Sequence, residues 1–164
     1  MKTAVIPGSF DPITVGHLDI ISRAGKLFDK VVVLVVVNPN KKPVFTADER
    51  IEFIKKATGN IPNVTADSYD GLLVDYVEQI GACSIVKGLR AMSDFEYEFQ
   101  MALTNKKLAP HIETMFLTTC IENLYLSSSL VRQLIYFGGD VSDFVPAVIH
   151  DEVVKELKER TRGK

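Results

Sequence analysis

The chain has 164 residues, 46% of them hydrophobic and 24% charged, and we expect a single domain over residues 1–164. Its formal net charge of -2 argues against a general nucleic-acid or membrane-surface role, because such proteins usually carry a basic excess. No apolar run could cross a bilayer and the opening MKTAVIPG is too short for a signal peptide, so we expect a cytoplasmic location.

Five apolar runs predict strands. The run Val31–Val37 (VVVLVVV) is continuous and β-branched, which is typical of a central strand covered on both faces. The other four are shorter and lie at Ala4–Ile6, at Val64–Ala66, around Ile85 and Val86, and at Met115–Thr119.

Helical patterns separate these strands. Thr46 with Glu49, and Ser93 with Glu96, have the spacing of capping boxes at helix starts, and Gly81 is typical of a helix end. The expected helices follow His17 as far as Phe28, surround Ile51–Ile54, and run over Leu72–Ile80, Ser93–Leu108, Ser129–Phe137 and Pro146–Arg160, with Pro146 in a first turn. The alternation predicts an α/β fold, a single-domain Rossmann-like parallel sheet with helices on both faces.

Four loops that follow predicted strands carry the chemistry. Open parallel sheets bind ligands at the carboxyl ends of their strands, near the switch in strand order, so these loops should meet at one edge. They supply small residues, hydroxyls, one histidine and several cations, which suits a phosphate-rich ligand. The loops are Gly8–His17, Asn38–Lys42, Lys87–Arg90 and a polar stretch that ends in Ser127–Ser129.

Each loop also has a structural interpretation. His17 could fill space beside a Gly/Pro turn, but its place at a helix start, after Gly16, favours anion binding. Lys42 is interpreted as a solvated loop lysine. For Lys87 and Arg90, and for the serine run, which could be only a helix N-cap, both interpretations stay open.

Several motifs are missing from the sequence. It contains no GxGxxG in the first turn, no GxxxxGK[ST], no HExxH and no GxSxG. This argues against a dinucleotide enzyme, a P-loop NTPase, a zinc site and an acyl hydrolase. Cys83 and Cys120 lie far apart in apolar segments and are expected to be buried thiols, not a disulfide or a metal site.

Motifs from the N-terminus to about Phe144 form an ordered set, namely Pro7–Thr14 with Gly16 and His17, Lys41–Pro43, Lys87–Arg90, Ser93–Glu98, and Ser127–Ser129 with Arg132. This set resembles the bacterial phosphopantetheine adenylyltransferase family, nucleotidylyltransferases that carry an (H/T)xGH motif. TxGH alone is weakly specific, whereas the ordered set is specific.

The resemblance implies one nucleotidylyltransferase domain that joins ATP to 4′-phosphopantetheine, with Mg²⁺, and releases dephospho-coenzyme A and pyrophosphate. It implies that His17 is catalytic, holds the ATP α-phosphate and stabilises the transition state without a covalent intermediate. A homohexamer and coenzyme A as a feedback ligand are implied as well. The ATP site would comprise Ser9, Phe10, His17, Gly88, Leu89, Arg90, Glu98, Asn123, Leu124, Tyr125, Leu126, Ser127, Ser128 and Ser129, and the phosphopantetheine site Ser9, Lys41, Leu73 and Lys87.

Three residues depart from the family pattern, and one of them, Ser9 in place of a frequent threonine, should keep its hydroxyl role. Lys87 stands where arginine is usual, which replaces a bidentate phosphate contact by a point charge, and Asn123 stands where an aromatic residue is common. Because the attacking phosphate is already an anion, position and electrostatics can drive the reaction without a strong base. We expect Lys41 and Lys87 to hold that phosphate, His17 to donate to the α-phosphate, and Arg90 with the serine-capped helix to bind the β- and γ-phosphates.

Two other functions fit the same loops. A sister enzyme could use the motif on another phosphate, such as nicotinamide mononucleotide or glycerol phosphate, and a sensor module could bind ATP without reaction. Thr14 in place of a first histidine, together with the Lys87–Arg90 and serine motifs, favours phosphopantetheine.

Overall fold

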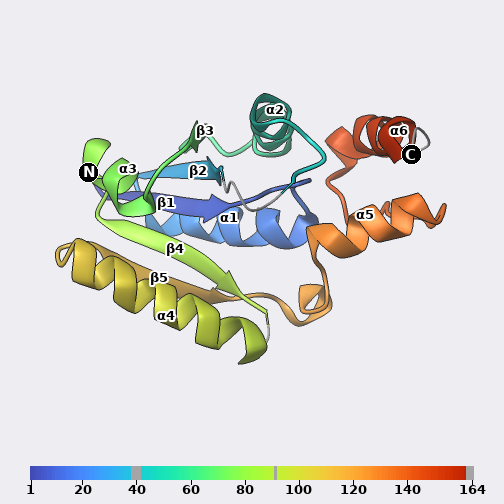
Figure 1. The fold of residues 1–164 in the computed structure, drawn as a ribbon. Helices are drawn as coiled ribbons and strands as arrows, with labels where there is room; N and C mark the ends of the chain where they lie inside the picture. The colour runs from blue at the N-terminus through green and yellow to red at the C-terminus, as the bar shows by residue number, and fades with distance from the viewer. Residues whose placement is uncertain (38–41, 91, 162–164) are drawn as a thin grey trace.

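The computed structural model describes residues 1–37, 42–90 and 92–161, which build one parallel five-stranded sheet in the order β3-β2-β1-β4-β5 (Figure 1). The strands are β1 (Thr3–Gly8), β2 (Lys30–Val36), β3 (Val64–Tyr69), β4 (Ser84–Leu89) and β5 (Glu113–Thr118). Each strand is parallel to its neighbours, and Val5 pairs with Val32 on one side and with Ile85 on the other. The predicted parallel sheet is confirmed.

Helices connect these strands and follow the last one. They are α1 (Val15–Leu27), α2 (Ala47–Ala57), α3 (Leu73–Gln79), α4 (Met92–Leu108), α5 (Ser128–Tyr136) and α6 (His150–Thr161), with two short 3-10 turns, η1 (Ile121–Asn123) and η2 (Ala147–Ile149). Figure 1 shows α5 and α6 beyond the carboxyl end of β1, on the side of the molecule where the strands end.

Both faces of the sheet are covered, as predicted. Along β2, the side chains of Val31, Val33 and Val35 join one buried cluster with α1 and α2, whereas Val32 and Leu34 join a second cluster with α3. Side chains alternate between the two faces of a strand, so a strand that is covered on both faces must be apolar at every position. This explains the continuous valine run.

Local signals at the helix ends have mixed outcomes. The capping box is confirmed at Thr46, whose backbone N–H donates to Glu49 Oε2 at 2.8 Å. Gly81 adopts a φ of +64° just after α3, so the predicted helix end is confirmed. The capping box at Ser93 is wrong, because α4 already begins at Met92 and Ser93 lies inside the helix. Pro146 precedes the short turn η2, and α6 begins only at His150.

The prediction of buried thiols needs correction. Both cysteines are free, as expected, but Cys83 is exposed and Cys120 is only half-buried. Cys83 directly precedes β4, and its side chain contacts the backbone carbonyl oxygen of Thr3 at the rim of the sheet. An apolar neighbourhood in the sequence therefore did not place this side chain in the core.

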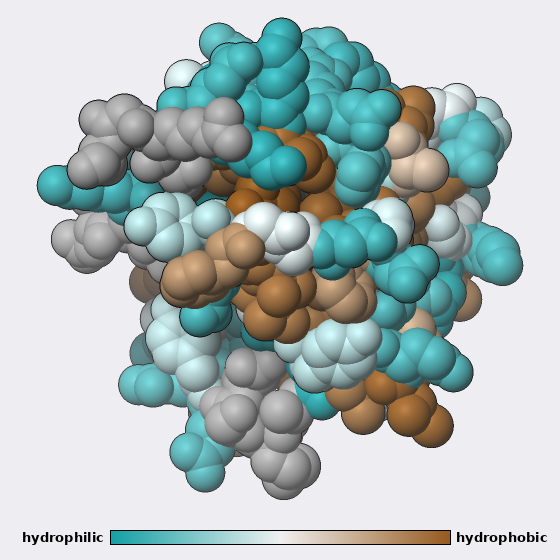
Figure 2. Space-filling view, turned by 90° about the vertical axis from the view of Figure 1, so that its right-hand side faces the viewer, coloured by the Kyte–Doolittle hydropathy of each residue, from teal (hydrophilic) through white to brown (hydrophobic). Residues whose placement is uncertain are grey.

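The face of the molecule on the side of α5 and α6 is largely hydrophilic, with an exposed apolar area among the polar residues (Figure 2). None of the helices in the described part of the chain is both long and apolar enough to span a membrane.

Candidate active site

A cleft of about 1040 Å³ opens where the parallel strands end. Its walls include residues that follow β1, β2, β3, β4 and β5, and its centre lies by β1 and β4, where the strand order reverses. Small-molecule sites are typically on the order of 300–1,000 Å³, so this cleft has room for more than one such ligand.

Most of the predicted site residues line this cleft. They are Ser9, Phe10, His17, Leu73, Lys87, Gly88, Arg90, Glu98, Asn123, Leu126, Ser127, Ser128 and Ser129. Leu89, Leu124 and Tyr125 were also expected at the site but do not line the cleft. Lys41 lies outside the described residues. Lys42, expected to be solvated, is exposed and also borders the cleft.

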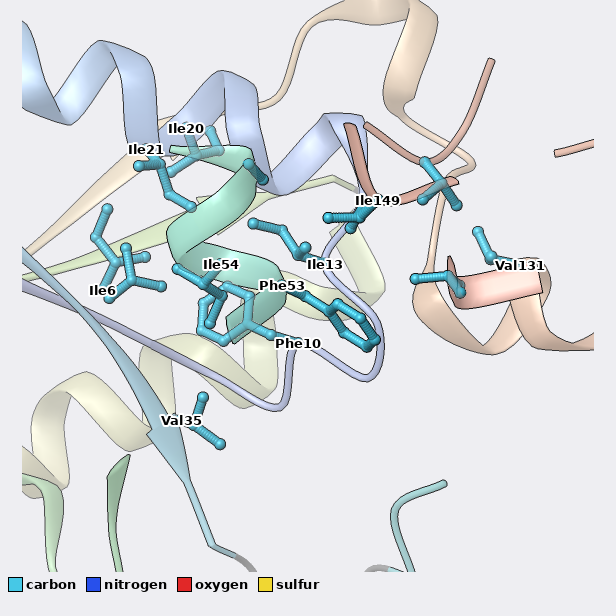
Figure 3. Close-up of a cluster of buried hydrophobic side chains, with 14 of the residues drawn as sticks. Ile6, Phe10, Ile13, Ile20, Ile21, Val35, Phe53, Ile54, Val131 and Ile149 are labelled. Atoms are coloured by element: carbon cyan, nitrogen blue, oxygen red, sulfur yellow. The ribbon is translucent and has the colours of Figure 1, made fainter. Parts of the chain in front are cut away.

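The loop after β1 is anchored by Phe10. This residue has a φ of +47°, unusual for a side chain other than glycine, and its ring is only 2% exposed. The ring points into the main core cluster, near Ile54 (Figure 3). A Cβ added at Gly8 would lie 2.9 Å from the same ring, so glycine is needed there for the loop to close over it. Phe10 therefore shapes the cleft mainly by fixing the loop backbone.

The buried carboxylate of Asp11 ties three segments together. It accepts hydrogen bonds from the backbone N–H groups of Val44 (3.0 Å) and Phe45 (2.9 Å), and Oδ2 pairs with Arg132 of α5 at 3.3 Å. On the same loop, Arg50 of α2 donates to the carbonyl oxygen of Ser9 at 2.8 Å. Buried charged groups are stable only when paired in this way, so the loop is held from two helices.

His17 is held in one tautomer by the helix cap. Thr14 is the N-cap of α1, and its backbone N–H donates to Nδ1 of His17 at 3.0 Å, while the His17 N–H donates to Thr14 Oγ1 at 3.4 Å. A backbone N–H can only donate, so Nδ1 is an acceptor and the proton of the neutral ring is on Nε2. Among the described residues Nε2 has no hydrogen-bond partner. Every buried side-chain nitrogen and oxygen of the described residues does have one, so Nε2 cannot be a buried atom. Nε2 is therefore open to the cleft.

The surroundings keep this ring neutral. Burial, and then the positive charges of Arg90 and Lys87, lower the pKa of His17 from 6.5 to about 4. At neutral pH the side chain is consequently an uncharged N–H donor pointing into a cationic cleft.

Two cations lie at the carboxyl end of β4, where the expected loop Lys87–Arg90 needs correction: Lys87 is still within the strand, and Arg90 directly follows it. Lys87 pairs with Glu98 of α4 at 3.1 Å, and both side chains are mostly buried. Arg90 donates to the carbonyl oxygen of Leu126 at 2.7 Å, which links the end of β4 to the segment before α5. These contacts fix two positive charges opposite His17.

The serine run caps α5 and joins it to the first loop. Ser127 is the N-cap and accepts from the N–H of Leu130 at 3.1 Å. Ser128 Oγ donates to the carbonyl oxygen of Pro12 at 2.8 Å, and Ser129 Oγ accepts from Arg132 at 3.3 Å. The capped start of α5 thus faces the cleft beside the loop after β1.

The charge balance of the cleft is positive although the chain is acidic. The charged residues in its described walls are Lys42, Arg50, Lys87, Arg90 and Arg132, against Asp11 and Glu98. Both carboxylates are already paired with cations of the same walls. Such a cleft concentrates anions locally, which a net charge for the whole chain does not reveal.

Sequence reasoning missed the residues that hold the loops in place. Asp11 contacts partners 33 and 121 residues away in the chain, and no local pattern signals contacts of that range. The Thr14–His17 spacing did carry a signal, since it has the separation of a capping box with histidine in the usual Glu position. Met101 and Leu108 of α4, and Leu72, which directly precedes α3, also line the cleft and were not predicted.

Comparison with known proteins gives a consistent result. Residues 5–134 match the model of the cytidylyltransferase-like family. A phosphopantetheine adenylyltransferase of Caldanaerobacter subterraneus subsp. tengcongensis is 54% identical over 158 residues, which cover 96% of this chain and 99% of that protein. One from Heliobacterium modesticaldum is 53% identical over 164 residues, covering 100% and 98%.

A solved structure shares the fold at much lower identity. It is a bifunctional NMN adenylyltransferase/ADP ribose pyrophosphatase from Francisella tularensis, with a TM-score of 0.72 and 15% identity over 98% of this chain and 52% of that one.

The lowered pKa of His17 predicts a pH-dependent stability. As the pH falls from 6.5 towards about 4, the unfolded chain binds a proton on this histidine that the folded protein does not, so folding stability declines over that window. We expect His17→Asn to lose less stability than the wild type between about pH 7 and about pH 4.5, measured as urea-unfolding free energies. His111→Asn, at an exposed histidine outside the cleft that lies 3.4 Å from Glu78, is the control for the loss of an imidazole. Parallel curves for His17→Asn and the wild type would contradict the assignment.

Proposed function

The chain belongs to the phosphopantetheine adenylyltransferases, within the cytidylyltransferase-like family, and on that premise we propose that it transfers the adenylyl group of ATP to 4′-phosphopantetheine. An oxygen of the phosphopantetheine phosphate forms a bond to the α-phosphorus of ATP. The bond from that phosphorus to the β-phosphate oxygen breaks, and pyrophosphate leaves with its electron pair. The products are dephospho-coenzyme A and pyrophosphate.

The observation that carries this proposal is that one neutral N–H donor, the His17 ring, lies close to two fixed cations. His17, Lys87 and Arg90 share one cleft, and burial together with the two cations lowers the pKa of the imidazole and keeps it uncharged. The attacking phosphate is already an anion, so the reaction needs no general base. It needs two mutually repelling anions to be held together and the charge gained by the α-phosphate to be stabilised.

His17 is proposed to donate from Nε2 to an oxygen of the α-phosphate. Its tautomer is set by Thr14, so no reorientation is needed when charge develops on that oxygen. A neutral donor of this kind stabilises the transition state without forming a bond to phosphorus.

Lys87, with Lys41 and Ser9, is proposed to hold the incoming phosphate. In the structure described here the ammonium group of Lys87 is paired with Glu98 at 3.1 Å. A phosphate that binds Lys87 therefore enters an existing ion pair, and the single ammonium gives it a point contact where an arginine would give two parallel bonds.

Arg90 and the capped start of α5 are proposed to hold the β- and γ-phosphates. Backbone N–H groups at a helix start and an adjacent guanidinium are a favourable combination for polyphosphate. The described cleft does not offer a carboxylate set for Mg²⁺, because Asp11 and Glu98 are engaged with Arg132 and Lys87. We therefore propose that Mg²⁺ arrives with ATP as part of the substrate, held by its phosphates and by water.

The acceptor is proposed to extend towards α3 and α4. Leu73, Met101 and Leu108 line that part of the cleft, which suits the long, weakly polar pantetheine chain better than a second nucleotide. This supports phosphopantetheine over a sister reaction on nicotinamide mononucleotide.

Three further expectations from the sequence stay predictions: the homohexamer, coenzyme A as a feedback ligand, and a cytoplasmic location. The homohexamer has support from α4, on which Phe99 and Leu103 are exposed and do not line the cleft. Apolar side chains exposed together on one helix are favourable sites for subunit contact.

One assay separates the candidate functions. The protein is mixed with ATP, Mg²⁺ and either 4′-phosphopantetheine, nicotinamide mononucleotide or glycerol phosphate, and pyrophosphate and product mass are measured. Of the three acceptors, we expect only 4′-phosphopantetheine to give pyrophosphate and an adenylylated product, dephospho-coenzyme A. Product with another acceptor would support a sister enzyme. ATP binding with no pyrophosphate from any acceptor would support a sensor module and overturn the proposal.

His17→Ala should lower kcat by about 100- to 1000-fold, because loss of one transition-state donor typically costs that much. The KM for ATP should change little, since the donor acts mainly on charge that develops during reaction. Steady-state kinetics on both substrates provide the measurement, and His111→Ala, at an exposed histidine, is the matched control. Near-normal turnover of His17→Ala would reject the assigned role.

Lys87→Ala should raise the KM for phosphopantetheine by about tenfold or more, the usual effect of losing one charge-assisted hydrogen bond. Lys87→Arg keeps the charge and should retain most of the affinity. Lys106→Ala removes another lysine paired with a glutamate, outside the cleft, and serves as the control. If Lys87→Ala and Lys106→Ala have the same KM for phosphopantetheine, Lys87 does not belong to the acceptor site.

A further inference from the structure

The segment that enters α2, residues 42–46, forms part of the cleft without belonging to a helix or a strand. Lys42 and Pro43 line the cleft, and the segment follows β2 in the chain. Backbone without regular structure has no ladder of hydrogen bonds to fix it, so its position depends on individual side-chain contacts. Those contacts come from both sides.

On the inner side, the segment is held by the first loop. The N–H groups of Val44 and Phe45 both donate to the buried carboxylate of Asp11. The carbonyl oxygen of Val44 takes no part in these bonds and accepts from Arg160.

On the outer side, the segment is held by Arg160, near the end of α6. Its Nη1 donates to the carbonyl oxygen of Val44 at 2.8 Å and to Oε2 of Glu49 at 3.1 Å, and its Nη2 pairs with Oε1 of Glu49. The guanidinium carbon lies 5.1 Å from the centre of the Phe45 ring. Arginine alone has the planar set of donors that can satisfy a carbonyl and a carboxylate at once while stacking on a ring.

Glu49 completes this arrangement. Its Oε2 also accepts from the backbone N–H of Thr46, so one carboxylate joins Arg160 to the last residue of the segment. The Arg160 guanidinium, with the Thr46 bonds, lowers the pKa of Glu49 to about 2, and the carboxylate remains charged across the neutral range.

We propose that Arg160 is a positioning residue for the acceptor phosphate, acting through residues 42–46. The inference rests on the proposed function, in which Ser9 of the loop after β1 helps to hold the phosphopantetheine phosphate. The Asp11 carboxylate of that loop accepts from Val44 and Phe45, and Lys42 and Pro43 line the same cleft. The strand order supports the choice of substrate. Segments after β2 and β3 lie on one side of the switch point, whereas Arg90 and the serine run follow β4 and β5 on the other. Loosening residues 42–46 should therefore affect the acceptor far more than ATP.

A second ion pair between the same helices provides a matched control. Lys56 of α2 pairs with Glu152 of α6 at 2.5 Å, with both side chains about half exposed, and neither residue contacts residues 42–46 through any described hydrogen bond. If the only role of Arg160 were to join α6 to α2, Lys56→Ala would have the same kinetic consequence as Arg160→Ala.

The experiment measures KM for both substrates, kcat and the thermal midpoint in the wild type, Arg160→Ala, Arg160→Lys and Lys56→Ala, well below the lowest midpoint. We expect Arg160→Ala to raise the KM for phosphopantetheine by about tenfold and the KM for ATP by less than about twofold, the effect of one lost charge-assisted contact. Arg160→Lys, which can satisfy one partner at a time, should lie between Arg160→Ala and the wild type. Lys56→Ala should keep both KM values.

Equal changes of both KM values in Arg160→Ala, or a phosphopantetheine KM that matches that of Lys56→Ala, would overturn the proposal. Should Arg160→Ala fail to fold, the same ratio of KM values in Arg160→Lys decides the question. The wild type is assayed first. If it forms no dephospho-coenzyme A, the proposed function is contradicted. If it is active but the variants keep its ratio of KM values, only this inference is contradicted.

Discussion

The site depends on one buried carboxylate. Asp11 fixes the loop after β1 against the segment before α2 through two backbone N–H groups, and against α5 through Arg132. These three segments carry, or directly follow, groups proposed to bind both substrates. A carboxylate that is 6% exposed in its side chain is stable there only because its oxygens are satisfied. The cost of leaving any of them unpaired keeps the three segments in register with one another.

The second constraint is the relation between His17 and its cationic neighbours. Burial disfavours imidazolium most, and the charges that would draw phosphates into the cleft add to this effect, so the pKa of His17 falls and the ring remains a neutral donor. A protonated ring would attract ground-state phosphates more strongly, but it would already be charged before reaction. Because Thr14 fixes Nδ1 as an acceptor, the only available proton points to the cleft. The Thr14 cap thus both begins α1 and sets the tautomer of His17.

The sequence predicted what local physics determines. The valine run, the Thr46 capping box and the Gly81 helix end each depend on residues close in the chain, and strand ends of a parallel sheet necessarily share an edge. The Asp11 contacts and the pairing of Lys87 with Glu98 depend on the folded arrangement, so composition and spacing could not supply them. Phe10 shows the limit most clearly, since a motif residue expected at the ligand puts its ring in the core and contributes to the cleft through the loop that it anchors.

The division of the rim has a consequence for how such folds change acceptor. His17 lies after β1 and Arg90 after β4, at the switch point, whereas the part of the cleft proposed for the acceptor is bordered by the segments after β2 and β3 and also by Lys87 of β4 and by α4. Exchanging those segments could alter the acceptor while leaving the adenylyl-transfer groups in place. The fold itself tolerates wide change in sequence, since a solved structure shares it at a TM-score of 0.72 with only 15% identity. In this chain the C-terminal helix contacts the segment after β2 through Arg160 and Val44, so the residue that we propose to position the acceptor lies beyond the family match at residues 5–134.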